Sequence, residues 1–350
     1  MLLKEKYNAL VYTGKEKVEL QERTLIPPKE DEVTIKIRRV SICGSDLGAY
    51  RFPSERFAVP LVLGHEFSGD VAAVGKNVTK LKVGARVTAN PMIPCGKCFF
   101  CKRGETNLCG NRKSMGTAIG GVRTDGAMQE YVTVKESMVI PIADTVSYQA
   151  AAMLEPCGVT LACAKKGYTE DEKSVVIIGV GPIGLLILKF LKAMSVPKVI
   201  CIDRMQNRLE KAKECGADLL IRADDTEAEL LVKQATEGYG ADRVIIAAGV
   251  GSAINQSFRF VRNGGCVVLV ALMHEQVTID PMEIVGRGLK FYGSYMFQSE
   301  MKEAAKMLAD QRLHVEDLVT SVFPLEEGEK AFALLTDPQN QEIKVQLSVS

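Results

Sequence analysis

Four closely spaced cysteines form the first group of residues able to do chemistry. They follow the pattern C-x2-C-x2-C-x7-C in a segment rich in glycine and proline, at Cys95, Cys98, Cys101 and Cys109. Thiolates that short turns bring together suit a tetrahedral zinc ion with no position left for a substrate. An iron–sulfur cluster is the alternative, but the segment lacks a Cys-Pro ending and the spacing of a ferredoxin. We therefore predict a structural zinc ion in a lobe at residues 90–112.

A second group of potential ligands comes from three separated segments, Cys-Gly-Ser-Asp, Gly-His-Glu and Leu-Glu-Pro. The residues concerned are Cys43, His65, Glu66 and Glu155. One thiolate, one imidazole and two carboxylates suit a zinc ion that keeps a replaceable position. Singly they are ordinary, since a lone cysteine is usually a small core residue and a lone glutamate a surface one. Their occurrence together predicts a catalytic zinc.

A glycine-rich turn with the spacing G-x-G-x-x-G lies between an apolar strand and an apolar helix. It contains Gly179, Gly181 and Gly184, with Pro182 and Ile183 between the last two. Such glycines permit a tight turn, close approach of a pyrophosphate and close packing of helix on strand. Free N–H groups at the start of the helix favour the phosphates. The turn predicts a dinucleotide site.

The choice of dinucleotide depends on Asp203, which ends the next expected strand, nineteen residues after Gly184. An acid at this position accepts hydrogen bonds from the adenosine ribose and repels a 2′-phosphate. NAD is therefore favoured over NADP. Arg208 weakens this preference, because an arginine beside the ribose accommodates a phosphate, although its ordinary interpretation is an exposed helix residue.

The elements that must position these residues change in character along the chain. Up to about Pro141, alternating apolar and polar residues, as in 33–38, and frequent turn residues indicate strands. From about Ser174, short apolar strands alternate with helical segments, which implies a parallel sheet with helices on both faces. A chain of 350 residues also exceeds the usual size of one domain.

Composition excludes several classes of function. Lys and Arg number 44 against 43 Asp and Glu, so no net field favours nucleic acid or an anionic membrane. The longest apolar stretch, 175–191, is interrupted by glycine, proline and lysine, which makes it a poor membrane span. The charged N-terminus has no signal-peptide pattern, so we expect a cytoplasmic protein with reduced thiols.

Taken in order, these motifs resemble the zinc-containing medium-chain dehydrogenase/reductase superfamily, and within it the branch of sorbitol, other polyol and threonine dehydrogenases. The resemblance spans nearly the whole chain and includes Leu63-Gly-His-Glu-Phe-Ser-Gly and Asp125-Gly-Ala-Met-Gln-Glu-Tyr. It implies a GroES-like, β-rich catalytic domain at 1–156 and 291–350. A Rossmann NAD-binding domain at 157–290 would be inserted in it.

The resemblance also implies roles for single residues. Cys43 and His65 match catalytic zinc ligands, and Glu66 matches a ligand or a carboxylate that exchanges with water. Glu155 matches a second carboxylate that ligates directly or through water, and stands where classical alcohol dehydrogenases have cysteine. Ser45 matches the hydroxyl that passes the alcohol proton outward. Many relatives carry a histidine shortly after Cys-Gly-Ser-Asp, but residues 47–50 here are Leu-Gly-Ala-Tyr.

The missing histidine leaves the end of the proton relay unassigned. His274 follows a segment that the family places near nicotinamide, so it is a candidate, although an ordinary loop histidine is the simpler interpretation.

These observations predict an enzyme with two zinc ions and NAD that oxidises a secondary alcohol to a ketone. The expected substrate is a polyol, sugar alcohol or sugar acid, phosphorylated or not, and the expected assembly is a homodimer or homotetramer. Threonine or 2,3-butanediol dehydrogenase activity is an alternative. Two further alternatives are an NADPH-dependent reductase without catalytic zinc and a non-enzymatic regulator that binds NAD or zinc.

Overall fold

The computed structural model describes residues 4–273 and 275–350, and the chain divides into two compact units. Unit 1 consists of Met1–Pro156 and Met301–Ser350, and unit 2 of Cys157–Glu300. The sequence placed the return to the first domain at residue 291. The structure places it at Met301, because β16 (Lys290–Gly293) is the edge strand of the sheet in unit 2.

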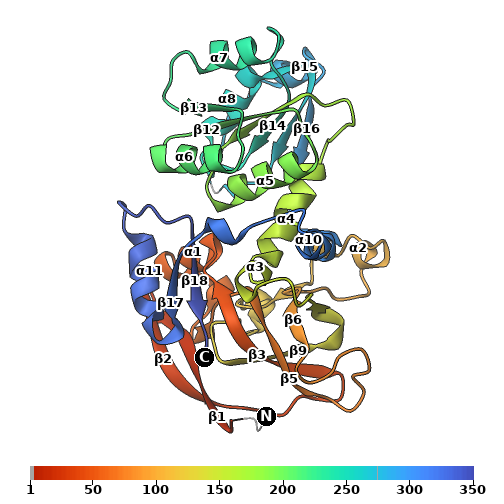
Figure 1. The fold of residues 1–350 in the computed structure, drawn as a ribbon, viewed down its shortest axis with the longest axis vertical. Coiled ribbons are helices and arrows are strands. Elements are labelled where there is room, and N and C mark those ends of the chain that lie inside the picture. Colours follow the sequence, from red (N-terminus) through yellow and green to blue (C-terminus); the bar gives the residue numbers. More distant parts are fainter. Residues whose placement is uncertain (1–3, 274) are drawn as a thin grey trace. The chain divides into compact units, whose positions relative to one another are not determined.

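Unit 1 is built mainly on a seven-stranded sheet of order β10-β6-β5-β3-β18-β17, in which β9 also pairs with β3 (Figure 1). Its strands are β3 (Glu32–Ser41), β5 (Glu66–Val74), β6 (Arg86–Ala89), β9 (Tyr131–Lys135), β10 (Val139–Pro141), β17 (Val319–Pro324) and β18 (Lys344–Ser348). The smaller sheets are β2-β1-β4 and β7-β8, formed by β1 (Lys6–Gly14), β2 (Lys17–Thr24), β4 (Leu61–Val62), β7 (Met92–Ile93) and β8 (Lys113–Ser114).

The central strand β3 is buried on both faces, although the alternation of apolar and polar residues at 33–38 suggests one exposed face. Ile35 and Ile37 lie in the apolar core as expected, but Thr34 and Lys36 on the other face are buried too. Neighbouring strands cover β3 on each side, because it pairs with β5, β9 and β18. These partners lie in the plane of the sheet, so the burial of Thr34 and Lys36 shows that other parts of the unit cover the second face of β3 as well.

Unit 2 contains a six-stranded sheet of order β13-β12-β11-β14-β15-β16, in which every pairing is parallel (Figure 1). Besides β16, the strands are β11 (Ser174–Ile178), β12 (Lys198–Asp203), β13 (Leu219–Arg222), β14 (Ala241–Ile246) and β15 (Val261–Leu269). This is the 3-2-1-4-5-6 order of the Rossmann fold, whose ligand site lies at the carboxyl ends of the strands. The expected fold class is confirmed.

Helices connect the strands within each unit. Unit 1 has α1 (Gly44–Arg51), α2 (Phe99–Lys102), α3 (Tyr148–Ala151) and α11 (Gly328–Thr336), and α10 (Glu300–Ala309) begins at its boundary. Unit 2 has α5 (Pro182–Ala193), α6 (Gln206–Glu214), α7 (Ala228–Ala235), α8 (Ser252–Phe260) and α9 (Pro281–Val285), and α4 (Leu154–Lys165) runs from one unit into the other. Within the described ranges, no helix has the length and hydropathy needed to cross a bilayer.

Candidate active site and metal centres

The first candidate metal centre joins side chains from the ends of β3 and β5. Cys43 precedes α1, His65 precedes β5, and Glu66 is the first residue of that strand. One potential ligand atom of each lies within 4.8 Å of those of the other two. The antiparallel register that pairs Ser41 with Glu66 brings these segments to the same edge of the sheet.

Asp46 holds two of these segments together, a role the sequence analysis missed. Its carboxylate accepts hydrogen bonds from the backbone N–H of Cys43 at 2.9 Å and of Gly64 at 3.2 Å. It also lies 3.7 Å from Nδ1 of His65, and burial raises the pKa of Asp46. A carboxylate beside the outer nitrogen of a ligating histidine orients the ring. The available signal was the final residue of Cys-Gly-Ser-Asp.

Gly64 is required by the close packing beside His65. Its φ is +91°, and a Cβ on it would lie 2.8 Å from Cγ of Met128. The left-handed backbone and the lack of space both demand glycine. This residue allows His65 to turn toward Cys43 while β5 begins.

A buried lysine reaches the same cluster from the C-terminal part of the chain. Nζ of Lys344, in β18, forms an ion pair with Oε2 of Glu66, and the two side chains are only 5% and 1% exposed. Burial lowers the pKa of Lys344, but Glu66 and Cys43 raise it, and the net pKa is above the ordinary value. Nothing in the local sequence around Lys344 indicated this contact.

Glu155 lies in the first turn of α4 and is 5% exposed. Burial and the carboxylate of Glu66 raise its pKa against the lowering effect of His65, and the resulting pKa is about 7. Its oxygens are outside the set of ligand atoms that lie within 4.8 Å of one another. The structure thus brings Glu155 into electrostatic range of the cluster without placing it in the innermost set.

The electrostatics of this cluster suit a cation. Burial lowers the pKa of His65, but Asp46, Cys43 and Glu155 raise it well above the ordinary value. A site that raises the pKa values of a histidine and a lysine is one where negative charge stabilises positive charge. Sulfur, imidazole nitrogen and carboxylate oxygen are also the donors that zinc prefers.

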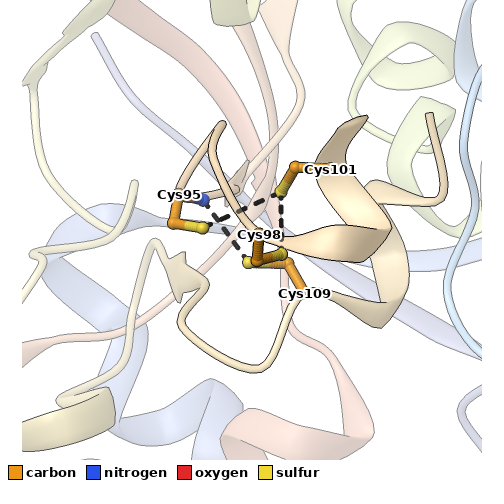
Figure 2. Close-up of side chains that lie close together, drawn as sticks. All are labelled: Cys95, Cys98, Cys101 and Cys109. Carbon is orange, nitrogen blue, oxygen red and sulfur yellow. Dashed lines mark hydrogen bonds between the residues drawn. The ribbon is translucent and has the colours of Figure 1, made fainter. Parts of the chain in front are cut away.

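The four cysteines form a second candidate metal centre, shown in Figure 2. Cys101 lies in α2 and Cys98 caps it, whereas Cys95 and Cys109 lie in the segments before and after this helix. The Sγ atoms of Cys98 and Cys101 are 3.5 Å apart, and those of Cys95 and Cys101 are 3.9 Å apart. Four sulfurs at tetrahedral corners with Zn–S bonds of about 2.3 Å are separated by about 3.8 Å. The spacing fits a closed zinc site.

Backbone groups stabilise negative charge within this second cluster. The N–H groups of Lys97 and Cys98 lower the pKa of Cys95 to about 6, and the N–H of Cys95 donates to Sγ of Cys109 at 3.4 Å. The thiolate is the form that binds metal. The turn therefore favours the thiolate of Cys95, whereas burial and the neighbouring thiols raise the pKa of Cys101 to about 12, so that this ligand loses its proton only when an ion binds.

The glycine turn has the geometry that its sequence predicts. Gly179 follows β11 with φ +90°, and a Cβ there would lie 2.7 Å from the backbone nitrogen of Ala248. A Cβ on Gly184 would lie 2.0 Å from the carbonyl oxygen of Gly179, whereas Gly181 has open space except for Arg208 at 3.7 Å. Pro182 begins α5, and Ile183 follows it. Gly179 thus makes the tight turn, Gly181 leaves room for a phosphate to approach the backbone, and Gly184 allows close packing of the helix on the strand.

Asp203 ends β12 beside this turn. Its carboxylate accepts hydrogen bonds from the backbone N–H of Val180 at 2.8 Å and of Met205 at 2.9 Å. Nη1 of Arg208 lies 4.0 Å from the same carboxylate. The acid and the arginine therefore both lie at the glycine turn, and Arg208 is not simply an exposed helix residue.

Two residues of the expected proton relay are less well defined. Ser45 is half-buried in the first turn of α1, two residues after Cys43. His274 lies outside the described residues, so its candidacy stays a prediction.

The chain matches two family models, the alcohol dehydrogenase GroES-like domain over residues 29–144 and the zinc-binding dehydrogenase over residues 182–310. It is 34% identical to the D-arabitol-phosphate dehydrogenase of Enterococcus avium, over 91% of this chain and 90% of that protein. It is 36% identical to the L-threonine 3-dehydrogenase of Bacillus licheniformis, over 90% and 92% of the two chains. The chain belongs to the zinc-binding alcohol dehydrogenase family.

A solved structure gives the same result for the fold. A short chain alcohol dehydrogenase from E. coli CFT073, complexed with the cofactor NADH, matches with a TM-score of 0.90 and 30% identity. The match covers 99% of this chain and 100% of that one. The resemblance to the zinc-containing dehydrogenases that the motifs indicated is thereby confirmed.

Proposed function

We propose that this protein is a zinc-dependent oxidoreductase that transfers a hydride from a secondary alcohol, of the polyol, sugar-alcohol or sugar-acid class, to NAD⁺ and gives a ketone. The observation that carries the proposal is the convergence of Cys43, His65 and Glu66 on one point. The E. avium relative acts on a sugar-alcohol phosphate by its name, which supports this substrate class and keeps phosphorylated substrates within it.

Cys43, His65 and the carboxylates Glu66 and Glu155 would hold the catalytic ion, and Cys95, Cys98, Cys101 and Cys109 the structural one. The catalytic zinc, when bound, supplies Lewis acidity that lowers the pKa of an alcohol oxygen. Asp46 fixes the orientation of His65 through its contact at Nδ1. Ser45 accepts the alcohol proton at its Oγ and passes it outward.

The proposed cofactor is NAD, held at the glycine turn. Its pyrophosphate would meet the start of α5, where N–H groups are free to donate. Asp203 would bind the ribose diol and repel a 2′-phosphate. Arg208, whose Nη1 lies 3.7 Å from the position that a Cβ on Gly181 would take, would contact a phosphate of the cofactor.

L-Threonine oxidation is the second candidate, since the B. licheniformis relative named for that activity is the more identical of the two. A polyol and threonine differ in the charges that the pocket must neutralise, so a substrate panel separates them. We further propose a homo-oligomer of the cytoplasm, a compartment in which the thiols of the four-cysteine lobe stay reduced.

The test is the reduction of NAD⁺ by the purified, zinc-loaded protein with polyols, polyol phosphates, sugar acids, 2,3-butanediol and threonine. Activity on a polyol or its phosphate, lost when the catalytic metal is removed and regained on adding zinc, is the expected result. Turnover that survives removal of that metal supports the zinc-free reductase instead. Metal and NAD binding without turnover on any alcohol supports a regulator.

A further inference from the structure

A row of buried polar side chains crosses three strands of unit 1 next to the candidate catalytic centre. Ser41 in β3 pairs with Glu66 in β5 on one side and with Gln346 in β18 on the other. Lys344 is two residues before Gln346, and side chains two apart in a strand face the same side. The strand register therefore places the Lys344 side chain on the same face of the sheet as Glu66.

Hydrogen bonds and an ion pair link the members of this row, although Oε1 of Gln346 is buried without a hydrogen-bond partner among the described residues. The amide Nε2 of Gln346 donates to Oγ of Ser41 at 3.1 Å and to the carbonyl oxygen of Gln149 at 2.9 Å. Lys344 pairs with Oε2 of Glu66, and both side chains are almost fully buried. Loss of one partner of a buried ion pair leaves the other charge uncompensated, so the position of the Glu66 carboxylate depends on this lysine.

Glu66 is therefore shared between two cations. One is the metal ion that Cys43 and His65 would hold with it, and the other is the Lys344 ammonium. A carboxylate that neutralises a buried ammonium has less charge to offer a metal, because both cations compete for the same oxygens. Without the ammonium, the Glu66 carboxylate would bind the metal more strongly.

We propose that Lys344 is a positioning residue that keeps Glu66 a weak, exchangeable zinc ligand and so leaves one coordination position open to the substrate alcohol. The inference rests on the proposed function, in which Cys43, His65 and Glu66 surround the catalytic zinc. Lys344 does not touch substrate or metal in this scheme. It acts only through Glu66.

The test replaces Lys344 by Met and follows the metal itself. Cobalt(II) is placed at the dispersed site while zinc stays at the four cysteines, and the visible spectrum is recorded with and without substrate alcohol. Cys43→Ala provides the baseline without a dispersed site. We expect K344M to bind cobalt at least as tightly as the unmodified protein does. Its visible absorption bands should be weaker, because the cobalt ion has more ligands, and its spectrum should not change when alcohol is added.

Turnover supplies the second readout. For K344M we expect kcat to fall about 10–100-fold, the usual effect of losing a partner of a metal ligand. Lys344→Arg keeps the cation and should restore the alcohol response and most of kcat. Lys344→Gln is a second neutral variant, made so that a folding failure of K344M does not end the test. Lys36→Met removes a buried lysine of β3 in the same unit and should leave the spectrum unchanged.

A double-mutant cycle distinguishes action through Glu66 from a structural role. In the Glu66→Gln background, neutralising Lys344 should cause no further spectral change, because the competing carboxylate charge has gone. Equal effects of K344M in both backgrounds, or a K344M spectrum that still responds to alcohol, overturn the inference. If the cobalt spectrum of the unmodified protein equals that of Cys43→Ala, the proposed catalytic centre itself is wrong. That result contradicts the proposed function and can be told apart from a failure of the role given to Lys344.

Discussion

The carboxylate of Asp203 accepts a hydrogen bond from the backbone N–H of Val180 at 2.8 Å, which joins the end of β12 to the middle of the glycine turn. The proposed ribose-binding acid is thus part of the turn that would hold the pyrophosphate. Its second bond, from the N–H of Met205, fixes the carboxylate as the chain enters α6. A change at Asp203 acts on cofactor choice through charge and through the shape of the turn.

Asp203→Ala should raise the ratio of kcat/KM for NADP to that for NAD by about tenfold or more, because a hydrogen bond to a charged group contributes roughly 1.5–3 kcal/mol and 1.4 kcal/mol is tenfold. The measurement is initial rates with both cofactors. Asp203→Asn is the matched control, since it keeps an acceptor for Val180 and removes only the charge. An unchanged ratio in both variants would remove Asp203 from the cofactor site.

Metal analysis after gentle purification should give about two zinc ions per chain, one for each cluster. Cys98→Ser should lower this to about one and increase the number of thiols that react in the native protein, because the remaining lobe cysteines lose their ion. A stoichiometry near one in the unmodified protein, with all four lobe cysteines reactive, would contradict the structural site.

Cys43→Ala and His65→Ala should each lower alcohol oxidation by several powers of ten, at about 1.4 kcal/mol of barrier per tenfold. Both residues belong to the candidate metal set, whereas the glycine turn is formed by a different part of the chain. NAD affinity by calorimetry should therefore change little. Unmodified turnover in a His65→Ala protein that lacks the catalytic zinc would disprove the metal-based mechanism.

Glu155→Ala should act more mildly, with a loss of about 10–100-fold, because its carboxylate lies outside the innermost set of ligand atoms. Zinc content and single-turnover rates are measured on the same preparation. Glu155→Gln keeps the size and hydrogen bonding of the side chain, so its activity should lie between that of Glu155→Ala and that of the unmodified protein. A loss as large as that of His65→Ala, with the zinc absent, would instead make Glu155 a direct ligand.

Asp242→Asn should destabilise unit 2 by about 1–3 kcal/mol at pH 7. Burial raises the pKa of Asp242, but bonds from Arg262, Lys173 and Ser174 lower it more, so the net pKa is below its ordinary value. The carboxylate therefore stabilises the fold above its unfolded pKa of about 3.9, and this contribution is lost as the pH falls through the lower folded pKa.

Urea unfolding followed at several pH values between 3 and 7 tests this linkage. The difference between Asp242→Asn and the unmodified protein should shrink toward the acid end. Asp224→Asn is the control, because Asp224 is mostly exposed and its pair with Arg222 should contribute little. A difference that stays constant with pH would mean that Asp242 acts by packing and not by charge.

The sequence by itself determined the features whose parts lie close together along the chain. The four-cysteine spacing, the glycine turn and the acid nineteen residues beyond it were readable because short segments impose their geometry directly. The alternation of strands and helices after residue 174 likewise predicted the parallel sheet, since βαβ units repeat locally. The ligand types of the scattered Cys43, His65, Glu66 and Glu155 together predicted a catalytic zinc, and family resemblance then gave each residue a role.

Only the tertiary structure decided the contacts that depend on strand register. No local pattern assigns Lys344 to Glu66, because β5 and β18 come together only through their shared neighbour β3. Asp46 joins Cys43 to Gly64 for the same reason, and β16 joins the parallel sheet of unit 2 by pairing with β15. A partner distant in sequence is chosen by the packing of whole strands, which no short segment specifies.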